Sequence, residues 1–268
     1  MTRPSVSVIM PAHNAARFIE AAIESVCVQS VSDWELLVSD DGSSDDTVKV
    51  ARDTLLRLGK LSKGRILSGT VRQGPARARN RAIAEARGKW LAFLDSDDLW
   101  AKDKLERQLP VFDDPDVRLL CGGYEVIDVF GRATGEYCVP PRTASYSDML
   151  RLNTVGCLTA IYDVERAGKV FMPDLPRRQD YGLWLSLIRP GGVVYGLDRI
   201  VGMYRRRSTG SVSSNKIAAT YWQWRLYREH EKLSMASSFR CLFNHAFRKS
   251  KKYAGGGSFP SDKRSPIW

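Results

Sequence analysis

The chain has 268 residues, 43% of them hydrophobic, which is enough to bury the core of one large domain. Its five cysteines are scattered and never form a C-x-x-C pair, so the sequence indicates neither a disulfide framework nor a zinc site. No window approaches the ~18 consecutive apolar residues of a membrane span, and the N-terminal apolar stretch is too short for a signal peptide, so we expect a cytoplasmic protein.

The formal net charge of +11 is concentrated at the C-terminal end of the chain. Residues 199–268 contain 15 Lys and Arg against 3 Asp and Glu, a net charge of +12, whereas residues 1–198 contain 26 against 27, a net charge of −1. A basic surface spread over the whole chain would indicate nucleic acid binding. A near-neutral body with a basic end instead predicts that this end docks on another surface, and it predicts no nucleic acid partner.

Strands and helices alternate through the first hundred residues. Short apolar, β-branched runs predict strands, and longer runs of helix-forming residues lie between them. We expect strands at 6–10, 34–39, 65–71 and 90–94, and helices at 15–28, 45–58 and 75–86. This alternation is typical of βαβ units and predicts an α/β fold with a mostly parallel sheet and helices on both faces.

A polar cluster follows three of these strands. Each cluster could be explained by local structure, such as a turn at Asp41-Gly42 or a helix N-cap at Ser44 or Asp45. Their joint occurrence instead predicts a ligand site, because ligands of such sheets bind at the carboxyl ends of the strands. The clusters are Pro11-Ala12-His13-Asn14, Asp40 to Asp45, and Asp95-Ser96-Asp97-Asp98.

The third cluster is the most acidic. Asp95, Asp97 and Asp98 repel one another unless a cation compensates their charge. Mg2+ and Mn2+ prefer such oxygen ligands, so the triplet predicts a divalent metal site. The alternative is an acidic loop before a helix that starts near Lys102, since the first turn of a helix favours negative charge.

The predicted third helix carries arginines at alternating positions. Arg77 and Arg81 are four residues apart and share a face, whereas Arg79 lies on the other side of the helix. We expect Arg77 and Arg81 to be solvated. Arg79 and the adjacent Asn80 are candidates to turn toward the cleft, where a guanidinium can bind phosphate.

Four segments of the chain occur in a recognisable order and spacing: SVIMPAHN, LLVSDDGSSDDT, GPARARNRAIAEARGKWLAFLDSDDLW and RRQDYGLWLSLI. Together they resemble the family 2 inverting glycosyltransferases, which have the Rossmann-like GT-A fold and include bacterial enzymes of surface polysaccharide synthesis. The resemblance covers residues 4 to about 213 and implies transfer of a sugar from a nucleotide diphosphate donor to a hydroxyl acceptor.

The resemblance implies a nucleotide site in the first two clusters. Pro11, Ala12 and His13, followed by Asn14, would line the nucleotide pocket. Asp41 would hydrogen-bond the base of the donor, which in this family is most often uracil.

The resemblance also implies where the chemistry takes place. Asp95 and Asp97 match the D-x-D motif that holds the metal-bound diphosphate, with Ser96 between them and Asp98 able to share the metal. Mg2+ or Mn2+ would stabilise the charge that develops on the leaving diphosphate. Asp180 matches the catalytic base that takes the proton of the acceptor hydroxyl. Its structural alternative is the N-cap of the following helix.

Two positions depart from the family pattern. Gln179 stands where many members have Glu before the catalytic Asp, which puts an acceptor contact in doubt. Arg206 and Arg207 stand where many members have His. An arginine there could contact the diphosphate but could not be a neutral metal ligand.

The rest of the chain predicts accessory elements. We expect a hairpin of 119–128 and 136–139, and a core position for Trp184. A helix at 218–233 is expected to pack on the domain. Residues 239–253 combine phenylalanines at helical spacing with cations, which predicts either a helix at an anionic membrane surface or a docked helix with a basic outer face.

These observations predict a GT-A domain over residues 1–213, a basic helical extension over 214–254 and a disordered tail over 255–268. We predict a metal-dependent enzyme that uses a nucleotide-diphosphate sugar, with UDP expected, and a glycan or lipid-linked acceptor at the cytoplasmic face of the membrane. Two other classes share parts of the pattern. A nucleotidyltransferase that makes such sugars would have a Gly-rich loop after the first strand, and a nucleic-acid-binding protein would have a basic body.

Overall fold

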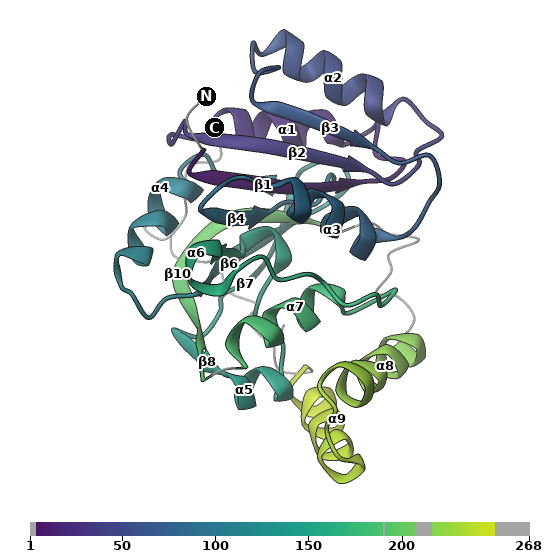
Figure 1. Ribbon diagram of the computed structural model, residues 1–268, viewed down its shortest axis with the longest axis vertical. Coiled ribbons are helices and arrows are strands. Elements are labelled where there is room, and N and C mark those ends of the chain that lie inside the picture. Colours follow the sequence, from purple (N-terminus) through teal and green to yellow (C-terminus); the bar gives the residue numbers. More distant parts are fainter. Residues whose placement is uncertain (1–3, 190, 207–215, 250–268) are drawn as a thin grey trace.

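The computed structural model describes residues 4–189, 191–206 and 216–249 (Figure 1). A ten-stranded sheet crosses the molecule in the order β3-β2-β1-β4-β9-β6-β10-β5, with β7 paired to β6 and β8 paired to β10. No helix in these three ranges has the length and hydropathy of a membrane span. Short helical segments join the strands: α4 (Lys104–Gln108), η1 (Leu109–Asp113), η2 (Cys157–Thr159) and α6 (Val164–Ala167).

The first half of the sheet is parallel, as its sequence predicts. It contains β1 (Val6–Ala12), β2 (Trp34–Asp40), β3 (Gly64–Ser68) and β4 (Trp90–Phe93). The connecting helices are α1 (Ile19–Cys27), α2 (Thr47–Arg57) and α3 (Pro75–Glu85), each within a few residues of the predicted range.

Both faces of this half are covered by helices, because alternate residues of each strand point to opposite sides. Val8 and Leu36 join the buried cluster formed with α1 and α2. Ile9 and Leu37 join a second cluster formed with α3 and α7 (Gln179–Ile188). Trp184 of α7 is fully buried in that second cluster, as predicted.

The second half of the sheet is mixed rather than parallel. β9 (Ile161–Asp163) inserts antiparallel between β4 and β6 (Leu119–Ile127). The predicted hairpin is formed by β6 and β7 (Ala133–Cys138), and the turn between them contains Gly131 with a φ of 84°. β10 (Val193–Arg205) runs parallel to β6, whereas β5 (Leu99–Trp100) and β8 (Thr143–Ser145) pair antiparallel with β10.

The C-terminal helices pack on the rest of the molecule beside α7 (Figure 1). They are α8 (Lys216–Arg225), the π-helix η3 (Leu226–His230) and α9 (Met235–Lys249). Of these, α9 contacts α5 (Tyr146–Arg151). Leu226, Tyr227 and Cys241 belong to the same buried cluster as Trp184. The extension therefore shares a core with the domain, and the predicted disordered tail over 255–268 lies outside the described residues.

Candidate active site

The three polar clusters meet at one edge of the sheet, where the arrowheads of β1 and β2 point in Figure 1. In the parallel register Ala12 faces Asp40, and the Asp41 amide donates to the Ala12 carbonyl oxygen at 2.8 Å. The Leu94 amide donates to the Ile9 carbonyl oxygen at 3.1 Å, one residue before Asp95. The backbone ladder thus brings together the clusters that the sequence places far apart.

The first two clusters form one rigid double loop after β1 and β2. His13 Nδ1 donates to the Asp41 carbonyl oxygen at 3.1 Å. Asn14 adopts a φ of 47°, a left-handed conformation that Asn tolerates better than most residues, and its Oδ1 accepts from the Ser44 amide at 2.9 Å. Pro11 and Ala12 are buried at the base of this double loop.

The Asp41 carboxylate organises the segment before α3. It accepts hydrogen bonds from the amides of Gln73, at 2.7 Å, and Gly74, at 2.8 Å. Gly42, with a φ of 69°, lies so close to this segment that a Cβ atom there would be 2.9 Å from Arg72 N. A carboxylate has about four lone-pair positions, so Asp41 retains acceptor positions beyond these two hydrogen bonds.

The Arg79 guanidinium pairs with the Asp95 carboxylate under the acidic loop. The Arg79 side chain is 6% exposed, and its Nε and Nη1 atoms are buried with no hydrogen-bond partner. Desolvation is the largest influence on Arg79 and lowers its pKa, but the charges of Asp95, Cys157 and Asp180 and the hydrogen bond to Asp95 together outweigh it, so the pKa is raised. Arg79 therefore pairs with Asp95 of the acidic loop and lies within electrostatic reach of Asp180.

Asp98 and Asp97 are held by Arg205 at the end of β10. The Arg205 amide donates to Asp98 Oδ1 at 2.8 Å, and its Nε donates to the Asp97 carbonyl oxygen at 2.8 Å. Asp98 is buried. Desolvation, followed by the charges of Asp97 and Asp95, raises the pKa of Asp98 well above its ordinary value. A nearby cation would favour the charged, deprotonated form of these carboxyl groups over the protonated form.

The acidic loop offers ligands for a divalent metal that takes the rest of its coordination from outside the protein. Among the described residues, no three acidic, His or Cys side chains already form a metal-binding group. Asp95 is 32% exposed, while Ser96 and Asp98 are buried. Because Mg2+ usually takes one or two carboxylates and completes its coordination with waters and phosphate oxygens, one or two aspartates of this loop are a suitable donor set.

Asp180 lies in the first turn of α7, so the helix begins before Asp180 rather than after it. The N-cap is Arg178, in a left-handed conformation with a φ of 67°, so Asp180 is not the cap. The segment before α7 is tied to α3, because Asn80 Nδ2 donates to the Met172 carbonyl oxygen and Asn80 Oδ1 accepts from the Met172 amide, both at 2.8 Å. Asn80 thus binds a loop rather than lining the cleft.

The remaining arginines have protein partners. Arg77 forms an exposed pair with Asp174 at 2.7 Å, and Arg81 Nε donates to Ser39 Oγ at 3.0 Å. Arg206 pairs with Glu136 of β7, with Nη2 to Oε2 at 2.8 Å, while Arg207 lies outside the described residues.

Sequence reasoning missed two residues of this region. The contacts of Arg205 with the acidic loop are not predicted by the sequence, because they depend on β10 returning to that loop. Cys157 of η2 lies within electrostatic reach of Arg79, Asp95 and Asp180, and burial raises its pKa well above the ordinary value. No local pattern in the sequence around Cys157 indicates this placement.

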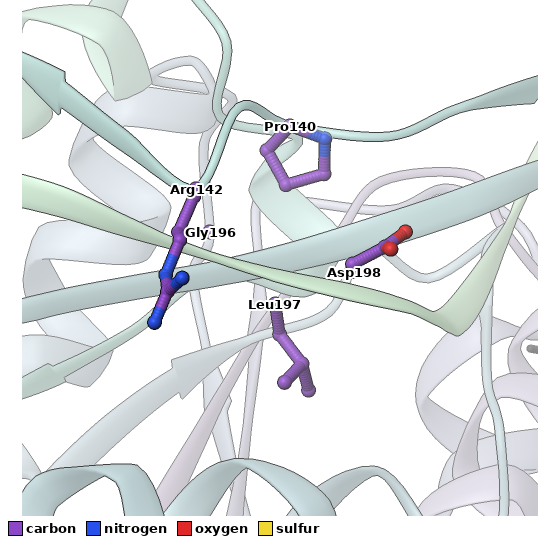
Figure 2. A pocket seen from close by; sticks show the side chains of 5 residues that line it. All are labelled: Pro140, Arg142, Gly196, Leu197 and Asp198. Atoms are coloured by element: carbon purple, nitrogen blue, oxygen red, sulfur yellow. The ribbon is translucent and has the colours of Figure 1, made fainter.

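A separate pocket of about 540 Å³ lies along β10 (Figure 2). Figure 2 shows Arg142 and Asp198 on opposite sides of it, with Pro140 above and Leu197 below. At about 3.3 Å per strand residue, Asp198 is about 23 Å along β10 from Arg205. The pocket is therefore remote from the acidic loop.

Residues 7–150 match the family described as Glycosyl transferase family 2. The chain is 37% identical over 251 residues to the putative teichuronic acid biosynthesis glycosyltransferase TuaG of Bacillus subtilis, covering 93% of this chain and 98% of that protein. It is 34% identical over 250 residues to the UDP-Glc:alpha-D-GlcNAc-diphosphoundecaprenol beta-1,3-glucosyltransferase WfgD of Escherichia coli, covering 93% and 95%.

Solved structures share the fold. S. aureus TarS residues 1–349 in complex with UDP-GlcNAc superpose with a TM-score of 0.67 at 19% identity, over 92% of this chain and 73% of that one. The mannosyltransferase PcManGT of Pyrobaculum calidifontis, in complex with GDP-Man and Mn2+, gives a TM-score of 0.64 at 21% identity, over 92% and 70%. These matches confirm the predicted fold class.

Proposed function

Because this chain belongs to glycosyl transferase family 2 and is a glycosyltransferase, we propose that it is an inverting, metal-dependent enzyme that moves a sugar from a UDP-linked donor to a hydroxyl of a lipid-linked acceptor. The observation that supports this proposal is the buried Arg79 guanidinium, which pairs with Asp95 of the acidic loop and lies within electrostatic reach of Asp180. An acidic loop suited to a diphosphate and a carboxylate suited to accept a proton thus act on one guanidinium.

The donor would be held by the double loop and the acidic loop. Pro11, Ala12, His13 and Asn14 would line the nucleotide, and Asp41 would accept a hydrogen bond from the N–H of uracil. A uracil donor is supported by the UDP-glucose in the printed name of WfgD, a relative that aligns with nearly the whole chain. The acidic loop follows β4, which pairs with β1 beside the double loop, so the diphosphate of such a donor would extend toward the acidic loop.

Asp95 and Asp97 would hold Mg2+ or Mn2+, with Asp98 able to assist from its buried position and Ser96 close to the diphosphate. When bound, the metal supplies positive charge that stabilises the departing diphosphate. Arg79 fixes the Asp95 carboxylate, and Arg205 fixes the loop that carries Asp97. Arg205 holds Asp97 through its backbone carbonyl oxygen, and Arg79 pairs with Asp95 Oδ1, so Asp95 would offer Oδ2 to the cation.

Asp180 would act as the general base. Its carboxylate takes the proton of the acceptor hydroxyl as that oxygen attacks the anomeric carbon, and the bond to the diphosphate breaks on the opposite face of the sugar. One displacement inverts the anomeric configuration. The placement of Asp180 in a helix whose preceding loop is tied to α3 supports this role, since a base must be held within hydrogen-bond reach of its proton.

The acceptor class follows from the relatives rather than from the loops of this chain. WfgD is named for a diphosphoundecaprenol acceptor, and TuaG for teichuronic acid biosynthesis. We place the enzyme at the cytoplasmic face of the membrane, where it would extend a lipid-linked oligosaccharide or a surface polysaccharide. The family match decides against the alternative of a nucleotidyltransferase.

Donor binding tests the proposal directly. The protein is heated with UDP-, GDP- and dTDP-sugars, each with and without Mn2+, and the melting temperature is measured. A bound donor stabilises the folded state by mass action, so UDP-sugars with Mn2+ should raise the melting temperature most. If GDP-sugars raise the melting temperature as much as UDP-sugars or more, the assignment of uracil as the nucleobase of the donor is wrong. If EDTA leaves the effect of the donors unchanged, the proposed role of the metal in donor binding is wrong.

A further inference from the structure

Helix α9 has one face packed on the domain and one face exposed to solvent. Ser238, Cys241 and Leu242 lie on the packed face, where Cys241 is part of the main buried cluster. The adjoining side of the helix, about a quarter turn away, carries Met235, Phe239 and Phe243, which are 55%, 60% and 74% exposed. We call these three residues the outer row of α9.

The outer row is a continuous apolar stripe rather than scattered exposed residues. Its members are four residues apart and so line up along one side of the helix. Neighbouring aromatic rings widen the stripe, because the Phe239 ring packs on that of Trp224 with 4.8 Å between centroids and Tyr221 of α8 is 53% exposed. Contiguous exposed apolar surface of this kind marks an interaction site.

The stripe lies within the most basic part of the chain. Residues 216–249 contain seven Lys and Arg and two Glu, a net charge of +5, and Arg240 follows Phe239 on an exposed part of α9. A second copy of this chain would present the same positive surface and be repelled. An apolar row flanked by cations is instead complementary to a surface with negative charge outside and hydrocarbon beneath it.

We propose that the outer row of α9 inserts into the headgroup region of an anionic lipid bilayer, with Arg240 and neighbouring cations on the lipid phosphates. Helix α9 then has one face packed on the domain and another in the lipid. Membrane binding rests on the proposed function only in its purpose, which is to bring the enzyme to a lipid-linked acceptor.

The extension that carries this lipid face contacts the helix that carries Asp180 through η3. A Cβ atom at Gly182, two residues after Asp180, would lie 3.1 Å from Leu226 Cδ1 of η3 and 2.5 Å from Pro173 Cγ. In Figure 1, α8 lies on the side of the molecule to which β1 and β2 point, and α9 lies at the end of the molecule away from α2. A bilayer bound by α9 would therefore cover the end of the molecule formed by the extension rather than the end formed by α2.

Point substitutions test the proposal better than a truncation, because removal of α9 would also expose the core around Cys241 and Leu226. Sedimentation with vesicles of phosphatidylcholine alone and with one quarter phosphatidylglycerol is measured for the full chain. The variants are Phe243→Ser, Met235→Ser and Arg240→Glu. Matched controls are Leu56→Ser and Lys49→Glu on α2, where Leu56 is 63% exposed and the Lys49 side chain 74%.

The wild-type chain should sediment with the anionic vesicles at low salt and less at high salt. Phe243→Ser should lower the vesicle partition coefficient about tenfold, the effect of losing one inserted phenylalanine, and Arg240→Glu should lower it on anionic vesicles. The α2 controls should bind like wild type. All variants should keep the UDP-sugar melting shift, which shows that they fold.

Three results would overturn the proposal. The first is that the full chain does not sediment with anionic vesicles at low salt, and the second is that the α9 variants sediment with them as well as the α2 controls do. The third is a dimer in solution that Phe243→Ser makes monomeric, which would assign the outer row to a second copy instead. Failure of the proposed function is a separate outcome, since it would appear as absent transfer to both short soluble and lipid-linked acceptors while vesicle binding persists.

Discussion

Substitution of Asp97 distinguishes a role in metal binding from a role in the stability of the fold. Desolvation and the neighbouring aspartates raise the pKa of Asp98, so one fewer charge in the loop should leave the ligand-free fold unharmed. We predict that Asp97→Asn abolishes sugar transfer and leaves the melting temperature of the ligand-free protein unchanged or higher. Asp116→Asn, at an exposed position outside the site, is the control. Full wild-type activity in EDTA would contradict the metal role.

Substitution of Asp180 distinguishes a role in donor binding from a role in the transfer step. We predict that Asp180→Asn keeps the affinity for the donor and lowers turnover about 10²-fold or more, the range expected for a general base. Single-turnover transfer and donor titration are measured on the same preparation. Asp174→Asn, which removes an exposed carboxylate of the preceding loop, should change turnover little. An equal fall in donor affinity and turnover would reassign Asp180 to donor binding.

At the scale of elements, α3 connects the two halves of the site. Arg79 pairs with Asp95 and the next residue, Asn80, holds the backbone of Met172 in the loop before α7. We predict that Asn80→Ala lowers turnover with little change in donor affinity, because the loop before Asp180 loses both hydrogen bonds. The stability cost is about 1–3 kcal/mol.

Arg77→Ala is the matched control for Asn80→Ala, since it removes an exposed ion pair from the same helix to the same loop. Exposed pairs contribute about 0–1 kcal/mol, so this variant should resemble wild type in both stability and turnover. A fall in donor affinity for Asn80→Ala would show that α3, and not the loop before α7, had moved.

At the scale of the whole molecule, the extension and the catalytic domain share one core. Leu226 is fully buried and lies beside Gly182 of α7, and the Tyr227 hydroxyl donates to the Leu150 carbonyl oxygen. We predict that Leu226→Ala lowers the stability of the entire chain by about 2–5 kcal/mol. Calorimetry should show a single transition that moves to lower temperature, whereas a separate early transition would mean that the extension folds independently.

The sequence by itself determined the first half of the fold and the position of the polar clusters. The strands β1, β2 and β4 are apolar runs that end in polar residues, and this pattern is local, so it can be read without knowing the neighbours. The family resemblance added the GT-A fold, which the comparisons confirm. The roles of Asp41, Asp97 and Asp180 stay predictions until the experiments above are done.

The tertiary structure alone decided which distant groups meet. Nothing local to β9 or β10 states that one inserts antiparallel beside β4 and the other returns to the acidic loop, so the mixed half of the sheet and the role of Arg205 could not be predicted. The same holds for the two faces of α9. Its helical spacing was visible in the sequence, but burial of Cys241 and exposure of Phe243 depend on where the helix packs, because side-chain environment is a property of the assembled chain.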